Sequence, residues 1–124
     1  SPREVDRLNI HHASHLALRR ALDHLASPPE HILVDGLPVP SLGDGHTAVV
    51  GGDRKSYTIA SASIVAKTTR DTLMRRLAER YPEYGWETNV GYSTPEHRTA
   101  LSECGPTPHH RRTFVPVQLS LELS

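Results

Sequence analysis

A short apolar run that ends in an acid and a glycine occupies residues 31–36, which read His31-Ile32-Leu33-Val34-Asp35-Gly36. Because a proline pair precedes the run and glycine closes it, the run predicts a buried β-strand. Asp35 then lies at the carboxyl end of the strand, where open α/β sheets place their ligands. The alternative is an Asx turn, in which the Asp35 carboxylate accepts hydrogen bonds from local backbone N–H groups. The position of Asp35 alone leaves both interpretations open.

The segment after this strand predicts a loop and a second strand. Residues 37–45 contain several prolines and glycines and are expected to form the loop. Residues 46–50 are apolar and rich in β-branched side chains, which favours a strand. Two strands make a poor sheet, so we expect any further strands to come from outside this chain.

Three helices are predicted. Apolar residues at spacings of three and four indicate long helices over residues 3–26 and 58–81. Thr94 is a suitable N-cap for a shorter helix that begins at Pro95 and ends before Gly105. The expected order is helix, strand, strand, helix, helix and tail.

The composition excludes several classes of protein. The chain has 124 residues, 36% of them hydrophobic, and a formal net charge of zero, which argues against charge-driven disorder. Its longest apolar run is far shorter than the roughly 20 residues of a membrane-spanning helix, so no membrane partner is expected. Cys104 is the single cysteine, which excludes an internal disulfide and favours a reduced, cytoplasmic setting. We expect Cys104 to be a core thiol and the nine histidines to be mostly surface or loop groups.

One face of the second long helix carries a hydroxyl and three charged side chains at spacings of four, namely Ser63, Lys67, Asp71 and Arg75. One interpretation is a surface ion-pair ladder, in which each pair contributes about 0.3–0.5 kcal/mol. The other is a metal-binding carboxylate among cations that contact phosphate. A second basic cluster follows near the end of the chain, at His109-His110-Arg111-Arg112, and it reads alternatively as a solvated charged loop.

Several motifs, taken together, resemble those of the ribonuclease HII family. The earlier ones are Glu4-Val5-Asp6-Arg7-Leu8-Asn9-Ile10, Leu33-Val34-Asp35-Gly36, Gly52-Asp53-Arg54-Lys55-Ser56 and Ile59-Ala60-Ser61-Ala62-Ser63-Ile64-Val65-Ala66-Lys67-Thr68-Thr69-Arg70-Asp71. The later ones are Tyr81-Pro82-Glu83-Tyr84-Gly85, Gly91-Tyr92-Ser93-Thr94-Pro95-Glu96-His97 and His110-Arg111-Arg112-Thr113-Phe114. The motifs agree in order, and the match covers nearly the whole chain up to about Pro116.

The resemblance implies an α/β fold of the RNase H-like type, with a mixed sheet and flanking helices. It also implies an endoribonuclease that hydrolyses the RNA strand of RNA–DNA hybrids and incises at ribonucleotides in duplex DNA. The family uses four carboxylates around Mg²⁺ or Mn²⁺, and Asp35 and Asp71 match two of these catalytic, metal-binding acids. Tyr92 matches the tyrosine that stacks under the sugar at the RNA–DNA junction. By charge and place, the further substrate contacts expected are Ser56, Lys67, Arg70, Arg111 and Arg112.

The chemistry of these residue types fits that activity. Two divalent ions about 4 Å apart can clamp a scissile phosphate, and hard oxygen ligands suit Mg²⁺. An aromatic platform beside the sugar, together with a contact to the 2′-hydroxyl, distinguishes RNA from DNA.

Two family motifs find no match here, namely Asp-Glu-Ala-Gly-Arg-Gly and Asp-Ser-Lys. They carry the other two carboxylates and the first strands, so residues 1–116 are expected to be the C-terminal portion of the catalytic domain, with the N-terminal strands missing. A start at Ser1 without methionine fits that expectation. The chain also has Thr88-Asn89-Val90 where the family often has Lys and His.

Because two carboxylates cannot easily hold two metal ions, we expect the nuclease to be the longer parent protein. We also expect that protein to be a monomer. The 124-residue chain alone is expected to be nearly inactive. The alternative function is a non-catalytic nucleic-acid-binding module.

The tail, residues 117–124, supports a further hypothesis. Apolar residues alternate from Val115 to Leu123, which predicts a strand or an extended segment, and Pro116 argues against a central strand. The run Gln118-Leu119-Ser120-Leu121-Glu122-Leu123 resembles the extended peptides that bind bacterial sliding clamps, although the usual terminal aromatic is absent. This assigns partner binding to Gln118, Leu119 and Leu121. The alternatives are a disordered terminus or a strand packed on the core.

Overall fold

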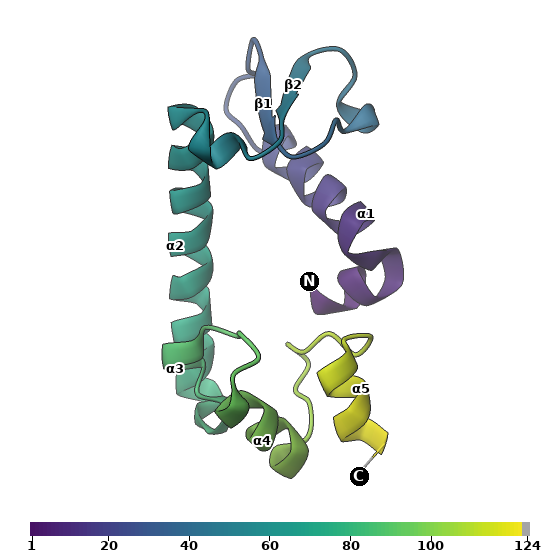
Figure 1. Ribbon diagram of the computed structural model, residues 1–124, viewed down its shortest axis with the longest axis vertical. Coiled ribbons are helices and arrows are strands. Elements are labelled where there is room, and N and C mark those ends of the chain that lie inside the picture. Colours follow the sequence, from purple (N-terminus) through teal and green to yellow (C-terminus); the bar gives the residue numbers. More distant parts are fainter. Residues whose placement is uncertain (123–124) are drawn as a thin grey trace. The chain divides into compact units, whose positions relative to one another are not determined.

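The sheet of this computed structural model is a parallel pair of strands, β1 (Ile32–Asp35) and β2 (His46–Val49), which lie side by side in Figure 1. Asp35 is opposite Val49 at the carboxyl end of the pair. The N–H of Gly36 donates to the carbonyl of Val49 at 3.0 Å, so the ladder continues just beyond Asp35. Both predicted strands are confirmed. The structure describes the backbone of residues 1–122 and the side chains of residues 1–119.

Within the described residues, five α-helices accompany the strands: α1 (Pro2–Asp23), α2 (Tyr57–Arg80), α3 (Trp86–Asn89), α4 (Pro95–Cys104) and α5 (Val115–Glu122). Three short 3-10 helices are η1 (Pro40–Leu42), η2 (Gly52–Arg54) and η3 (Pro82–Tyr84). The three predicted helices are confirmed. Two short helices, η3 and α3, lie between α2 and α4 and were not among the predicted elements. The chain is therefore α/β, and its described sheet is purely parallel.

Local side chains explain where α1 and α4 begin. The N–H of Glu4 donates to Ser1 Oγ at 3.4 Å, and that hydroxyl donates to the Glu4 carboxylate at 2.9 Å. Thr94 Oγ1 accepts a hydrogen bond from the N–H of His97 at 3.3 Å, so Thr94 caps α4 as predicted. Non-helical backbone at Asn9 (φ 65°, ψ 168°) divides α1 into two helical segments.

The chain forms two compact units. Unit 1 comprises Ser1–Ile10 and Thr68–Ser124, and unit 2 comprises His11–Lys67. In unit 2, the most deeply buried apolar side chains are Val34, Val39 and Ile59.

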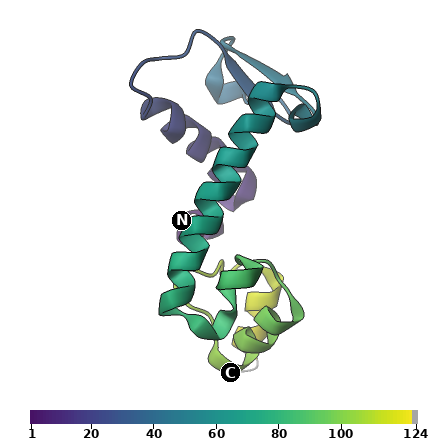
Figure 2. The same ribbon diagram turned by 90° about the vertical axis from the view of Figure 1, so that its left-hand side faces the viewer.

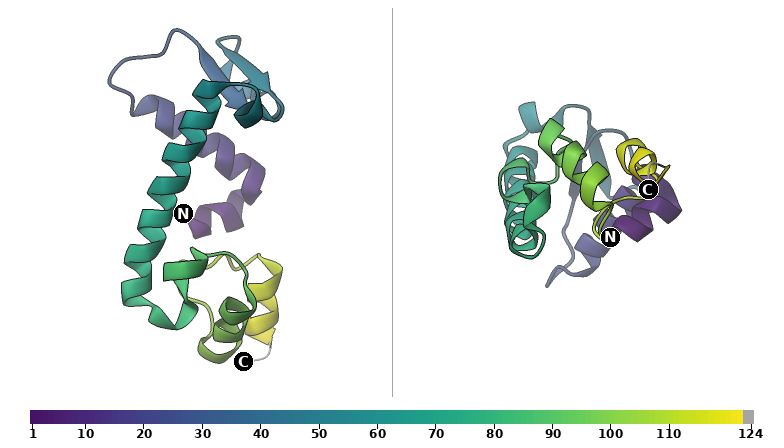
Figure 3. Two further views of the ribbon diagram at one scale, coloured as in Figure 1. Left: turned by 60° about the vertical axis from the view of Figure 1, so that its left-hand side comes forward. Right: turned by 90° about the horizontal axis from the view of Figure 1, so that it is seen from below.

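Unit 1 has an aromatic core. Its buried members are Ala78, Tyr84, Trp86, Ala100, Leu101 and Val117. Helix α4 packs against η3 and α5, and Figures 2 and 3 show α4 and α5 close together in this unit. Trp86 is the most enclosed of these residues and stacks on Tyr84 with ring centroids 5.2 Å apart. Tyr81 packs against the same cluster, so three of the chain's aromatic side chains meet in this core.

The tail differs from the expected strand or extended segment, because it forms helix α5. Pro116 lies in the first turn of α5, where its missing N–H has no intrahelical partner to lose. Val117 is 2% exposed and belongs to the core of unit 1, which secures the start of the helix. The alternation of apolar residues therefore gave the wrong secondary structure. The side chain of Leu121 lies outside the described residues.

Two other expectations about burial were wrong. Cys104 is exposed at the last position of α4 and is not the core thiol that was expected. The apolar positions whose spacing predicts α2, namely Ala62, Ala66, Thr69, Leu73 and Leu77, are mostly exposed, and Leu73 retains 56% of its accessible surface. In residues 1–122, no helix combines the length and the apolar character needed to cross a membrane.

Candidate functional site

Asp35 is held at the end of β1 by a non-local hydrogen bond. Its Oδ1 accepts from the N–H of Gly52, 2.8 Å away, at the start of η2. The side chain is exposed, and within the described residues Oδ2 makes no hydrogen bond to protein. The partner is distant in sequence, so this is not the local Asx turn considered above. One oxygen orients the carboxylate and the other faces solvent, which is an arrangement that suits a ligand to a cation.

The surroundings of Gly52 leave little room for a side chain. A Cβ built on Gly52 would lie 2.6 Å from Cδ1 of Ile59 and 3.4 Å from the Asp35 oxygen. Ile59 is buried, so a Cβ at Gly52 would require the Ile59 side chain or the Gly52 backbone to move.

Ser56 and Lys67 also belong to unit 2. Ser56 precedes α2, and its Oγ accepts a hydrogen bond from the N–H of Ile59 at 3.4 Å, which is the geometry of an N-cap. The hydroxyl of Ser56 therefore has a structural task at the helix start. Lys67 lies on the exposed surface of α2.

Asp71, on α2 in unit 1, is shielded from solvent. Its side chain is 13% exposed, and its Oδ1 lies 3.9 Å from Nη1 of Arg70. Arg70, its neighbour in sequence, is an ion-pair partner of Asp71 that the ladder of Ser63, Lys67, Asp71 and Arg75 did not include. At 3.9 Å the pair is a loose one.

Arg70 and Tyr92 are brought together. The guanidinium carbon of Arg70 lies 5.2 Å from the centre of the Tyr92 ring. Tyr92 is 61% exposed, and the carbonyl of its backbone accepts a hydrogen bond from Nδ1 of His97 at 2.9 Å. The ring thus stands on a fixed backbone with a cation at its face.

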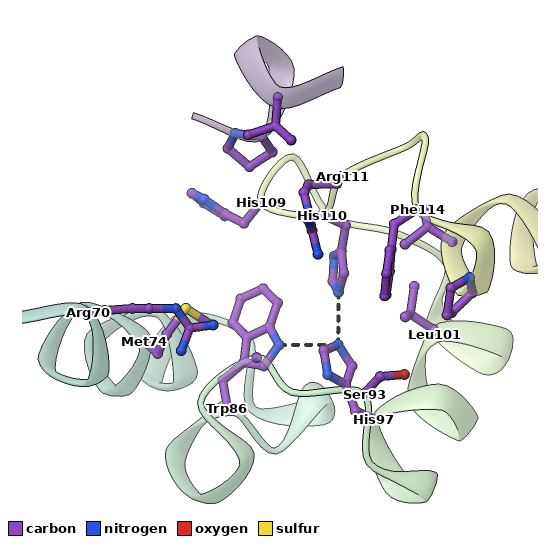
Figure 4. Close-up of a pocket in the computed structure, with 15 residues that line it drawn as sticks. Arg70, Met74, Trp86, Ser93, His97, Leu101, His109, His110, Arg111 and Phe114 are labelled. Carbon is purple, nitrogen blue, oxygen red and sulfur yellow. Dashed lines mark hydrogen bonds between the residues drawn. The ribbon is translucent and has the colours of Figure 1, made fainter. Parts of the chain in front are cut away.

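A pocket of about 410 Å³ opens beside this pair within unit 1. Figure 4 shows Arg70 and Met74 at one end, Trp86 and His97 at the base, Arg111 beside His110 above them, and Phe114 toward the other end. Two of the predicted substrate contacts, Arg70 and Arg111, therefore line one pocket. The guanidinium of Arg111 lies 4.6 Å from the Phe114 ring centre.

The basic segment that contains Arg111 and Arg112 is anchored by an acid from α1. The Asp6 carboxylate accepts hydrogen bonds from the N–H of Arg112 at 2.9 Å, the N–H of Thr113 at 3.0 Å and the Thr113 hydroxyl at 2.7 Å. These bonds, led by that from the Thr113 backbone, hold the pKa of Asp6 below its usual value. The sequence analysis did not single out Asp6, because its partners lie more than a hundred residues away.

Two histidines that were expected on the surface are buried in unit 1. His97 on α4 is 5% exposed and His110 is 8% exposed, and their Nε2 atoms are 3.0 Å apart. Burial is possible because the ring nitrogens of both residues find hydrogen-bond partners inside the unit. Nothing in the sequence spacing of these residues signals the contact.

The donor chemistry of Asp35 and Asp71 fits a hard divalent cation, because carboxylate oxygens are the preferred ligands of Mg²⁺. Over the described residues, however, no group of three or more His, Cys, Asp or Glu side chains is assembled. The acids supplied by residues 1–119 therefore do not by themselves make a complete metal centre.

The comparison with known proteins decides the family. A family model described as Ribonuclease HII matches residues 1–117. This chain belongs to the ribonuclease HII family. It is 57% identical over 120 residues to the Ribonuclease HII of Granulibacter bethesdensis, covering 97% of this chain and 55% of that protein. It is 55% identical over 118 residues to the Ribonuclease HII of a Synechococcus species, covering 95% of this chain and 53% of that protein.

A third ribonuclease HII, from a Jannaschia species, is 52% identical over 118 residues, covering 94% of this chain and 59% of that protein. The chain thus spans little more than half the length of the ribonuclease HII proteins it matches. The resemblance on which the sequence analysis rested is confirmed at the level of the family.

Proposed function

We propose that the whole protein containing residues 1–124 is an endoribonuclease that hydrolyses the RNA strand of RNA–DNA hybrids and incises at ribonucleotides embedded in duplex DNA. Membership of the ribonuclease HII family supports this activity class. The structural observation that carries the proposal is the exposed Tyr92 ring with the Arg70 guanidinium at its face.

An aromatic platform beside a cation has the right chemistry for a nucleotide. The ring offers a surface on which a sugar or base can stack, and the guanidinium supplies paired donors to the adjacent phosphate. Arg111, which lines the same pocket, and Arg112, held by Asp6, extend the positive charge. Ser56 and Lys67 are proposed as further phosphate contacts from unit 2.

Asp35 and Asp71 are proposed as two of the carboxylate ligands of the divalent ions, Mg²⁺ or Mn²⁺. The fixed Oδ1 and solvent-facing Oδ2 of Asp35 support its part in this set. When bound, such ions polarise the scissile phosphate and stabilise charge on the leaving oxygen. The hydrogen bond from the Gly52 N–H to Oδ1 fixes the Asp35 carboxylate and so orients Oδ2. This chain can supply that oriented oxygen by itself.

We propose that the remaining metal ligands and strands come from a segment of the whole protein that corresponds to the part of its ribonuclease HII relatives not matched by residues 1–124. The parallel pair β1–β2 is marginal as an independent sheet. The exposed Ile64 and Val65 on α2 give an apolar surface that further chain would cover. It follows that residues 1–124 alone are expected to cleave little or not at all.

The test uses a duplex with a single ribonucleotide and Mn²⁺. The whole protein is expected to cut at the ribonucleotide, and Asp35→Asn to lower the rate by at least a hundredfold. Asp44→Asn, at an exposed position of the η1–β2 loop, is the matched control and is expected to leave the rate unchanged. A whole protein that binds the duplex without cutting it would instead establish the non-catalytic binding module.

The 124-residue chain is assayed in parallel. Robust cleavage by that chain, lost in Asp35→Asn, would overturn the proposal that it is inactive alone.

A sliding-clamp contact through α5 is a second proposal, and its support is exposure. Gln118 is exposed and Leu119 retains 55% of its accessible surface. Binding as an extended peptide requires α5 to unwind beyond Val117, which is anchored in the core. Deleting residues 118–124 from the whole protein should weaken binding to the clamp, and an unchanged affinity would dismiss the contact.

A further inference from the structure

The buried pair His97–His110 joins two parts of unit 1 that the function proposed above uses for nucleic acid. His97 comes from α4 and His110 from the loop that leads to Arg111, and Figure 4 shows their rings facing each other with Trp86 alongside. Their Nε2 atoms are 3.0 Å apart. One of the two nitrogens must therefore carry a proton and donate the hydrogen bond, and the other must be unprotonated and accept that bond.

The neighbours of His97 settle its side of the bond. Its Nδ1 lies 2.9 Å from the carbonyl oxygen of Tyr92, which can only accept, so Nδ1 carries the proton. In the neutral ring, Nε2 is then the acceptor. The indole N–H of Trp86 also points at this Nε2, from 3.3 Å, which agrees with that assignment.

The neighbours of His110 settle the other side. The backbone N–H of Thr107 donates to Nδ1 of His110 at 3.0 Å, so this Nδ1 carries no proton. The neutral His110 ring then has its proton on Nε2, and this N–H donates to Nε2 of His97. One tautomer for each ring satisfies every neighbour, and both rings are neutral.

The surroundings favour that neutral form. Burial, followed by the nearby His97 and His109, lowers the pKa of His110 to about 4. The other ionisable group against His110 is Tyr84, whose ring centroid is 5.0 Å away, while Arg111 follows it in the chain and lines the same pocket. A second proton on His110 would face the N–H of Thr107, placing two donors against each other.

We propose that His97 and His110 act as positioning residues, a neutral hydrogen-bonded pair that fixes the backbone of Tyr92 relative to the Arg111–Arg112 segment. The chain of bonds runs from the Tyr92 carbonyl through both rings to Thr107. Neither histidine needs to touch nucleic acid. The expected effect of the pair on nucleic-acid binding rests on the proposed function, whereas the hydrogen bond between the two histidines and their tautomers do not.

The first arm of the test is nitrogen-15 NMR of the imidazole rings in the whole protein, without nucleic acid. At pH 7 we expect His97 as the Nδ1–H tautomer and His110 as the Nε2–H tautomer, with His110 remaining neutral down to about pH 5. A charged His110 at pH 6, or the opposite tautomers, would overturn the proposal whatever the protein's activity.

The second arm compares side chains that replace one nitrogen at a time. His97→Asn keeps a donor near the Nδ1 position and so can still hold the Tyr92 carbonyl, whereas His97→Leu cannot. We expect His97→Leu to raise KM for a single-ribonucleotide duplex about tenfold with a much smaller change in kcat, and His97→Asn to restore most of the loss. His11→Gln, exposed on α1, is the matched control.

Equal losses in His97→Asn and His97→Leu, or a loss confined to kcat, would contradict a positioning role. If the unchanged protein neither binds nor cuts the duplex, the proposed function fails, while the NMR arm still decides the pair. If His97→Leu does not fold, the wild-type tautomers and the Asn variant remain as tests.

Discussion

The Arg70 guanidinium lies at the face of the Tyr92 ring, 5.2 Å from the ring centre, and both side chains are substantially exposed. An exposed cation–π contact contributes about 0.5–1 kcal/mol, so it orients the two groups more than it stabilises unit 1. Its value lies in presenting an aromatic surface and a cation together.

Replacing the Tyr92 ring should therefore affect binding and not folding. Base–aromatic stacking contributes about 1–3 kcal/mol, so Tyr92→Leu is expected to weaken binding of a ribonucleotide-containing duplex by about tenfold or more. Tyr92→Phe keeps the stacking surface and should retain most of the affinity. Fluorescence anisotropy with Asp35→Asn protein, which is expected not to cut, measures both. Equal affinities for the Leu and Phe variants would contradict the stacking role.

Asp6 should support the basic segment through its carboxylate. Asp6→Asn weakens the acceptor of three hydrogen bonds and is expected to lower the free energy of unfolding at pH 7 by about 1 kcal/mol. Because the pKa of Asp6 is lowered in the folded state, its contribution is present above the unfolded value of 3.8 and disappears as the pH falls through the folded pKa.

Urea unfolding of the wild-type and Asp6→Asn proteins at pH 7 and pH 3 tests this dependence. The difference between them should shrink at the lower pH. Asp23→Asn, at the exposed end of α1, is the control. A difference that is the same at both pH values would show that the charge of Asp6 is not involved.

Burial of His110 should make the stability of unit 1 fall as the pH falls. The pKa of His110 drops from its ordinary 6.5 to about 4 in the folded state, so between these values the unfolded chain binds a proton that the folded chain does not. Stability from this source is full above about pH 6.5 and decreases toward pH 4, by on the order of 3 kcal/mol at most.

Urea midpoints measured between pH 7 and pH 4.5 follow this loss. In His110→Gln the part of the slope due to His110 should vanish. If the variant keeps the full wild-type slope, other groups are responsible for it.

Gly52→Ala should shift the Asp35 carboxylate indirectly, through the Gly52 N–H that donates to it. The added Cβ would meet Cδ1 of Ile59 at 2.6 Å, and relief of that overlap must move either Ile59 or the N–H that holds Asp35. Overpacking of this kind costs about 1–3 kcal/mol, and cleavage by the whole protein should fall as well.

Gly45→Ala is the matched control, because a Cβ there meets nothing within 4 Å. Its stability and cleavage rate should stay near those of the wild type. If Gly52→Ala behaves the same way, the close approach at Gly52 is not a constraint.

What the sequence could predict was local. The β1 strand and the acid at its end followed from a run of six residues, and the Thr94 cap followed from one hydroxyl before a proline. Both depend on neighbours within a few positions, and the structure has them as expected.

What it could not predict depends on distant partners. His97 and His110 look like surface residues until the fold brings their rings together, and Asp6 acquires its role only from Arg112 and Thr113. The tail failed for a related reason, since alternating apolar residues also suit a short helix once Val117 has a core to enter.

The bond between Asp6 and Thr113 also constrains the order in which the chain can fold. The two residues are 107 positions apart, so their contact closes a long loop and carries a large entropic cost. During synthesis, Asp6 must wait until residue 113 has left the ribosome, whereas the contiguous residues of unit 2 are all available much earlier. The start of α1 is therefore expected to dock late, and a ribosome stalled before residue 113 should hold unit 1 unfinished.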